Sequence, residues 1–65
     1  MIRVTRLNGS EFVLNADLIR TVEARPDTTI KLVNGDSFVV REPVDEIVDR
    51  AVEYGRSLRT LLGPA

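Results

Sequence analysis

Two nearly identical stretches constrain the fold of this chain more than any other feature of its sequence. The first, "LNGSEFVLN", covers residues 7–15, and the second, "VNGDSFVVR", covers residues 33–41. In each, an Asn-Gly pair separates two runs of alternating apolar residues, which is the strongest short-range signal of a β-hairpin. A two-residue type I′ turn needs positive φ at both central residues, and Asn-Gly satisfies that need. The repeat therefore predicts two hairpins of one design, with Asn8, Gly9, Asn34 and Gly35 as structural turn residues.

An anion-binding loop is the functional alternative for the repeated Asn-Gly. Phosphate-binding loops carry more glycines and open directly into a helix, where backbone N–H groups hold the anion. Neither stretch does so, because each runs into a further alternating segment. Turn formation is therefore favoured over ligand binding.

Two-residue loops predict a sheet that is apolar on both faces. They place Val4 opposite Val13, Thr5 opposite Phe12 and Ile30 opposite Val39. The apolar residues then divide between the faces: Ile2, Val4, Val13, Ile30, Leu32 and Val39 on one, and Leu7, Phe12, Leu14, Val33, Phe38 and Val40 on the other. Because an antiparallel sheet normally leaves one face polar, we expect a second copy of the chain to cover the other face.

The small size of the chain also favours self-association. A domain of 65 residues rarely gains more than about 3–5 kcal/mol from a single core. The chain contains no cysteine and no histidine, so it forms no disulfide and no thiolate zinc site. The sequence therefore predicts a homo-oligomer, either a dimer or a trimer.

The remaining segments complete a small α+β domain over residues 1–65. Residues 19–25 predict a third strand, and a three-residue loop at "RPDT" then places Val22 opposite Leu32 and Ala24 opposite Ile30. Five antiparallel strands within residues 2–41 follow one another as a meander. A helix is predicted over about 43–62, with Pro43 in its first turn, acidic residues early and arginines late.

The end of this helix is the predicted surface for self-association or for binding a partner. Its last turns are expected to overhang the sheet, and an exposed leucine cluster usually marks a contact. The apolar residues of this candidate surface are Tyr54, Leu58, Leu61 and Leu62, with Arg56 and Arg59 as a polar rim.

Neither catalysis nor metal binding is predicted. Asp45, Glu46 and Asp49 could hold a divalent cation, but a solvated first turn matched to the helix dipole is favoured. Without histidine or cysteine, only carboxylate, lysine or hydroxyl chemistry remains. The prediction is a chain with no enzyme activity, no catalytic residue, no cofactor and no metal.

Binding of DNA or RNA is the alternative function. Basic residues could form a stripe on the sheet: Arg3, Arg6, Arg20, Arg25, Lys31 and Arg41. However, the net charge is −1 and acids are interspersed, and stacking platforms need exposed aromatic residues. Phe12 and Phe38 occupy core-like hairpin positions, so scattered surface charge is favoured over a nucleic-acid site.

The expected location is the cytoplasm. No apolar run approaches the roughly 20 residues that span a bilayer, so no membrane insertion is predicted. The first residues, "MIRVTR", enter an alternating strand pattern directly rather than a signal peptide.

Over residues 1–56 the chain resembles the small flagellar FlbD-type proteins, also called SwrD-type swarming-motility proteins. The motifs that carry the resemblance are "VTRLNG", "FVLNADLI", "PDTTIKLVNG" and "FVVRE", in this order. Pro43 replaces a small hydroxyl residue of the family pattern, and Arg20 replaces a frequent acid. The resemblance implies a cytoplasmic, non-catalytic accessory of swarming motility that supports motor torque through the stators. It implies association with the flagellar motor and assigns no catalytic residue.

Overall fold

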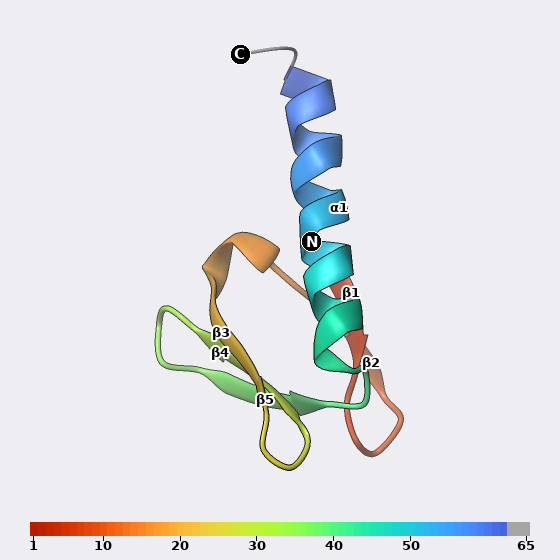
Figure 1. Ribbon diagram of the computed structural model, residues 1–65, viewed down its shortest axis with the longest axis vertical. Coiled ribbons are helices and arrows are strands. Elements are labelled where there is room, and N and C mark those ends of the chain that lie inside the picture. The colour runs from red at the N-terminus through yellow and green to blue at the C-terminus, as the bar shows by residue number, and fades with distance from the viewer. Residues whose placement is uncertain (63–65) are drawn as a thin grey trace.

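The computed structural model describes the backbone of residues 1–62 and the side chains of residues 1–56. Five antiparallel strands and a short 3₁₀ turn precede one long helix (Figure 1). The elements are β1 (Ile2–Thr5), β2 (Glu11–Leu14), η1 (Ala16–Leu18), β3 (Ile19–Ala24), β4 (Thr28–Leu32), β5 (Ser37–Val40) and α1 (Val44–Leu62). The predicted α+β class, with two hairpins and a carboxy-terminal helix, is confirmed.

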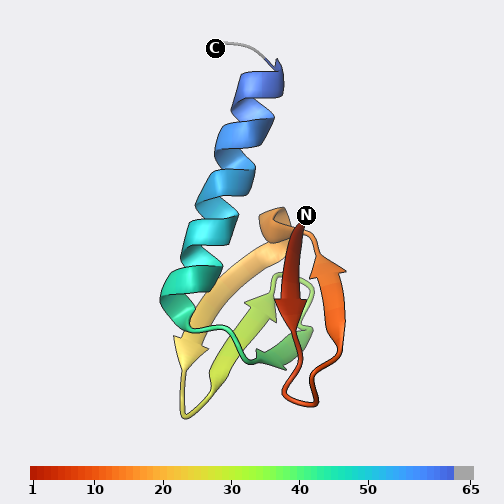
Figure 2. The ribbon, with the colours of Figure 1, turned by 90° about the vertical axis from the view of Figure 1, so that its right-hand side faces the viewer.

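The strands are divided between two sheets, whereas a continuous meander was expected. One sheet pairs β1 with β2, and the other has the order β3-β4-β5. Between β2 and β3 the chain turns through η1, which Asn15 caps by accepting a hydrogen bond from the Asp17 N–H at 3.0 Å. The sheets meet instead where β1 and β5 end, through an Arg6–Val40 bridge and a 2.8 Å bond from the Arg41 N–H to the Thr5 carbonyl. Figures 1 and 2 show the β1–β2 hairpin set apart from the three-stranded sheet.

Both Asn-Gly hairpins have three-residue loops, so the predicted type I′ turns are wrong. The Gly9 N–H donates to the Arg6 carbonyl at 2.9 Å, and the Gly35 N–H donates to the Leu32 carbonyl at 3.1 Å. Only the glycines adopt positive φ, at +94° and +95°, as in a turn closed by a glycine bulge. The third loop residue shifts the register of each hairpin by one residue, and the two asparagines serve a different purpose.

That purpose is a side-chain bond to the backbone two residues ahead. Asn8 Oδ1 accepts from the Ser10 N–H at 2.9 Å, and Asn34 Oδ1 accepts from the Asp36 N–H at 3.0 Å. Asparagine forms such turns without entering the left-handed region. The repeat is thus two copies of one folding device, as predicted, but the device is an asparagine-capped loop with a glycine bulge.

The one-residue shift also corrects the predicted two-sided apolar sheet. Val4 lies opposite Phe12 and Ile30 opposite Phe38, so the apolar residues of each hairpin gather on one face. Val13 and Val39 turn outward and are 53% and 41% exposed. A single-residue slip moves every side chain to the other face, which is why the sequence-based register predicted a second apolar surface. That argument for an oligomer therefore has no support in the fold.

In the β3–β4 hairpin the side chains lie on the predicted faces, but the residues opposite them on the neighbouring strand differ from the prediction. Val22 lies opposite Ile30 rather than Leu32, and Ala24 opposite Thr28, with residues 25–27 as the loop. A shift by two residues preserves the face of each side chain. The inner faces of both sheets and one side of α1 enclose the core, whose buried residues are Ile2, Val4, Leu14, Ile30, Leu32, Val40 and Ile47.

The helix begins directly after Pro43 and is attached to the sheets by its first turns. The Pro43 carbonyl accepts from the N–H groups of Glu46 and Ile47, at 3.0 and 3.2 Å. Ile47 is completely buried, and α1 packs against β1 and β3. The rest of α1 extends well beyond the strands (Figures 1 and 2). The fold thus leaves two sides of α1 next to the strands, and the end of the helix projects beyond them.

Candidate functional site

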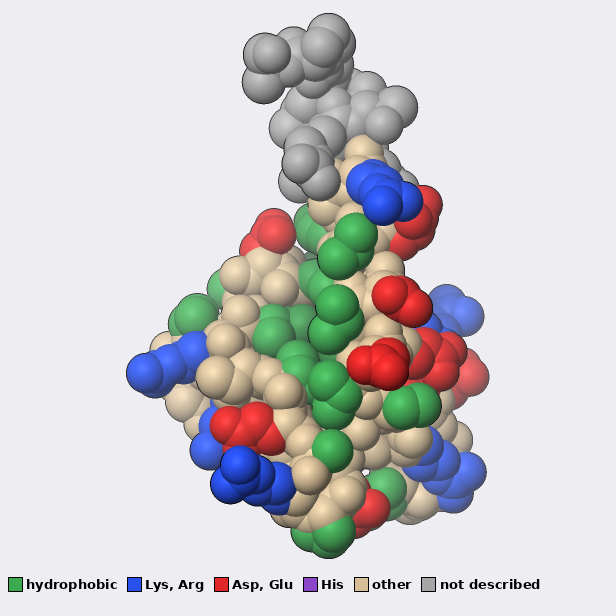
Figure 3. Space-filling model, in the orientation of Figure 1, with side chains coloured by type: hydrophobic (Ala, Val, Ile, Leu, Met, Phe, Trp, Pro, Cys, Tyr) green, Lys and Arg blue, Asp and Glu red, His purple; other side chains and the backbone are tan. Residues whose placement is uncertain are grey.

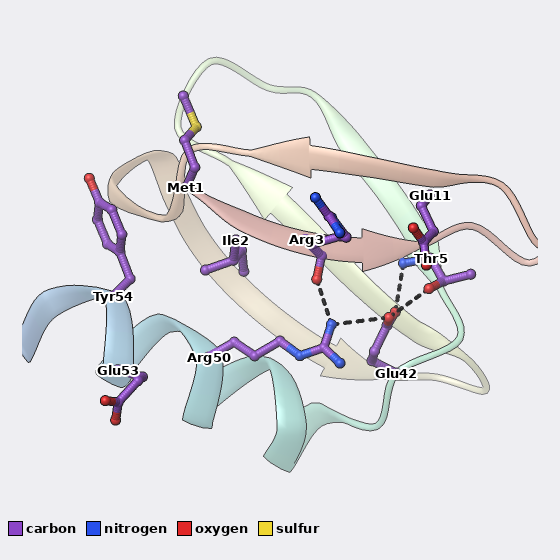
Figure 4. A pocket seen from close by; sticks show the side chains of 9 residues that line it. All are labelled: Met1, Ile2, Arg3, Thr5, Glu11, Glu42, Arg50, Glu53 and Tyr54. Atoms are coloured by element: carbon purple, nitrogen blue, oxygen red, sulfur yellow. Dashed lines mark hydrogen bonds and ion pairs between the residues drawn. The ribbon is translucent and has the colours of Figure 1, made fainter. Parts of the chain in front are cut away.

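A polar cluster joins β1 to α1 on one side of the helix. Its members are Thr5, Glu42 and Arg50. The Glu42 carboxylate accepts from the Thr5 N–H at 2.9 Å, from the Thr5 hydroxyl at 2.8 Å and from Arg50 Nη1 at 3.3 Å (Figure 4). Arg50 also donates to the Arg3 carbonyl and to Glu46 Oε1. We call these three residues the Glu42 cluster; it fixes the helix to the first strand.

The carboxyl group of Glu42 is held in its charged form. Only 8% of the residue is exposed, and this burial by itself raises the pKa of the carboxyl. The hydrogen bonds from the Thr5 N–H, the Thr5 hydroxyl and its own backbone N–H, together with the charge of Arg50, outweigh burial and lower that pKa below its ordinary value. Glu42 was not singled out from the sequence, so its buried role was missed.

Beside this cluster lies an open pocket of about 590 Å³ between β1 and α1. Its lining mixes apolar, aromatic and charged side chains: Met1, Ile2, Arg3, Thr5, Glu11, Glu42, Arg50, Glu53 and Tyr54. Figure 4 shows Tyr54 and Met1 at one end and the Glu42 cluster at the other. We call it the β1–α1 pocket.

The other flank of α1 forms a groove with η1 and β3 that is almost entirely apolar. Its volume is about 460 Å³, and we call it the α1–β3 groove. The lining residues are Ala16, Ile19, Val22, Ile47, Val48, Ala51, Val52 and Gly55. Figure 3 shows hydrophobic side chains running along the helix and across to the neighbouring strand on this side.

The predicted surface at the helix end is only partly within the described side chains. Tyr54 is half-buried, packs against the core and lines the β1–α1 pocket. Arg56 is exposed and lies 3.7 Å from Glu53. The side chains of Leu58, Arg59, Leu61 and Leu62 lie outside the described residues.

Two of the six basic residues proposed as a nucleic-acid stripe take part in contacts within the fold. The Arg6 guanidinium lies over the Phe12 ring at 4.2 Å, and the Phe12 and Phe38 rings are 5.1 Å apart. Arg41 donates to the Leu7 carbonyl through Nε at 2.9 Å and Nη2 at 2.7 Å. The equivalent phenylalanines of the two hairpins therefore pack on each other beneath an arginine, and do not form exposed stacking platforms.

Within residues 1–56, no group of three or more acidic, histidine or cysteine side chains is placed to hold a metal ion. Asp45, Glu46 and Asp49 are therefore not gathered into such a site. Within the described residues, α1 contains no stretch with the length and hydropathy of a membrane span.

A family model described as flagellar and swarming motility proteins, FlbD, matches residues 1–58. The chain belongs to the FlbD family. The match covers all five strands and most of α1, and so includes both the β1–α1 pocket and the α1–β3 groove. Neither the curated proteins nor the solved structures provide a match. Membership of FlbD implies a role in flagellar and swarming motility, in a family not known for enzyme activity.

Proposed function

We propose that this protein is a non-catalytic, cytoplasmic accessory of the flagellar motor. It supports motor torque by binding a protein of the stator or of the motor close to it. Family membership supports the motility role, and the β1–α1 pocket supports the protein-binding role.

The composition of the β1–α1 pocket carries this proposal. Methionine, tyrosine and arginine are enriched in protein interfaces, where an apolar centre is surrounded by a polar rim. Met1, which is 65% exposed, and Tyr54 supply apolar and aromatic surface. Arg3, Glu11 and Glu53 supply charges on the same lining. A partner segment with an apolar anchor and complementary charges fits this arrangement.

The Glu42 cluster gives this surface a defined shape. It ties Thr5 of β1 to Arg50 of α1, so the two walls of the pocket are held at a fixed separation. Preorganised walls lower the entropic cost of binding. The cluster therefore acts as a positioning element beneath the surface on which the partner binds.

Reversing the charge of Arg3 tests the proposal. Arg3→Glu should abolish or strongly reduce swarming, because an acid replaces a base in the pocket lining, while thermal stability changes little. The Arg3 side chain is exposed, so its replacement leaves the core intact. Swarm expansion on soft agar and the melting temperature of the purified chain are the two measurements.

Lys31→Glu is the matched control, because Lys31 is an exposed base on β4 away from this pocket. It should leave swarming unchanged. Affinity capture from motile cells should recover a motor or stator protein with the wild type and with Lys31→Glu, but not with Arg3→Glu. Equal swarming by both variants would contradict a partner surface at the pocket.

A further inference from the structure

The α1–β3 groove is an apolar surface that the described residues of the chain leave open. Val48 and Val52 are each 47% exposed on its helical wall. Ile19 and Val22 form the facing wall on β3 and are only partly buried. Continuous apolar surface of this kind on a small domain usually marks a contact.

The helix that forms one wall of the groove continues past the strands. Its backbone is helical to Leu62, and Figures 1 and 2 show no strand beside its last turns. Helical spacing places position 58 on the same side as Ala51, and position 62 on the same side as Gly55. The sequence has leucine at both positions. By the same spacing, position 59, an arginine, lies on the same side as Val52, so the groove wall continues along the projecting end with leucine at two positions and arginine at one.

The charges of α1 select the direction in which a second helix can lie. Residues 44–53 contain Asp45, Glu46, Asp49 and Glu53 with a single base, Arg50. Residues 54–62 contain two arginines and no acid. An antiparallel pair of α1 helices places each acidic half beside the other's basic half, and also opposes the helix dipoles favourably. A parallel pair places like charges together.

We propose that a second copy of this chain occupies the groove, with the two α1 helices antiparallel about a two-fold axis near Gly55. The projecting helix end of each copy lies in the α1–β3 groove of the other. In this register position 52 lies opposite position 58 of the second copy, and position 48 lies opposite its position 62. The contact is self-complementary, so the assembly closes as a dimer.

Gly55 is consistent with this crossing point. It lies inside a helix, where glycine is less favourable than alanine, and it lines the groove. A Cβ built there meets no atom within 4 Å, setting aside neighbouring residues and the local helix backbone. Packing against the described residues therefore does not require a glycine here. At a two-fold axis, a residue without Cβ allows two helix backbones to approach closely.

A charge placed in the groove tests the dimer. Wild-type protein at about 100 micromolar should sediment as a dimer of the 7.3 kDa chain. Val52→Lys should raise the dissociation constant at least tenfold, because it places a positive charge in the contact beside the basic half of the second helix. Val13→Lys is the control, since Val13 is 53% exposed on β2 and lies outside the groove; it should dimerise like wild type.

Single cysteines test the direction of the helices, because the natural chain has none. Under mild oxidation, a mixture of Val52→Cys and Leu58→Cys chains should form the mixed disulfide several-fold faster than either variant dimerises alone. Faster self-crosslinking of each variant would indicate parallel helices and overturn the proposal. A monomeric wild type with native far-UV circular dichroism would also overturn it, and would leave the groove to a different protein.

Discussion

Replacing Glu42 with glutamine should lower the free energy of unfolding by about 2 kcal/mol at neutral pH, because the bonds to a charged acceptor are among the stronger ones in proteins. Glutamine keeps a single acceptor oxygen where the carboxylate has two. The Thr5 N–H, the Thr5 hydroxyl and Arg50 then compete for that oxygen. Since the whole core of so small a domain supplies only about 3–5 kcal/mol, the variant should be close to unfolding. Urea denaturation followed by circular dichroism measures the change.

The effect should depend on pH with a defined sign. The folded-state pKa of Glu42 is below its unfolded value, so folding favours the ionised carboxylate. Its contribution is fully present above the ordinary glutamate pKa of about 4.3 and is lost as pH falls through the lower folded pKa. The difference in stability between wild type and Glu42→Gln should therefore shrink below about pH 4. A difference that stays constant from pH 7 to pH 3 would contradict a charged Glu42.

Glu46→Gln is the matched control for this prediction. Glu46 also pairs with Arg50, at 2.6 Å, but its side chain is 47% exposed. Exposed pairs within one helix contribute only about 0.3–0.5 kcal/mol. The same chemical change should therefore cost several times less at position 46 than at position 42. Equal losses would mean that burial of Glu42 is not the source of its effect.

Introducing valine at Gly9 or Gly35 should lower the free energy of unfolding by about 1–3 kcal/mol each, because a β-branched residue is strained at positive φ. Steric crowding is a smaller factor. A Cβ at Gly35 meets nothing within 4 Å, and one at Gly9 lies 3.5 Å from Arg41 Nη2, an ordinary contact. Gly9→Val should be the more damaging, since its larger side chain also disturbs the bonds from Arg41 to the Leu7 carbonyl. Thermal melts of both variants measure these losses.

Ser37→Val is the control for the glycine variants. Ser37 is exposed on β5, close to Gly35 but within a strand, where valine is favoured. It should leave the melting temperature unchanged or raise it slightly. If a glycine variant instead kept wild-type stability and lost binding of inorganic phosphate, the loops would be anion sites after all.

The two Asn-Gly loops show what a local sequence pattern can and cannot predict. The local pattern predicted two hairpins and their positions correctly, because asparagine and glycine restrict the backbone wherever they occur. It gave the wrong register because two-residue and three-residue loops use the same pair of residues. Ser10 and Asp36, each two residues after an asparagine, were the available signal, since their N–H groups donate to the asparagine side-chain oxygens. The one additional residue in each loop decided the register, and so which apolar side chains meet in the core.

The candidate surfaces were harder to predict than the elements. Acidic residues early and arginines late correctly located the helix, but this pattern gave no sign that Glu42 is buried. Its burial depends on Thr5, which is remote in sequence and is placed beside it only when β1 packs next to α1. Similarly, Ile19 and Val22 become the wall of a groove only because α1 leaves part of β3 uncovered.

The sequence by itself determined the secondary structure of this protein: two hairpins nucleated by Asn-Gly, a third strand, and a helix whose charges match its dipole. These features follow from interactions between residues close in the chain, and local patterns report them directly. Only the tertiary structure decided the division into two sheets, the packing of Phe12 on Phe38 beneath Arg6, the burial of Glu42 and the open groove beside α1. Each of these depends on which surfaces meet when distant segments pack, and packing is a property of the whole core, which no short stretch of sequence contains.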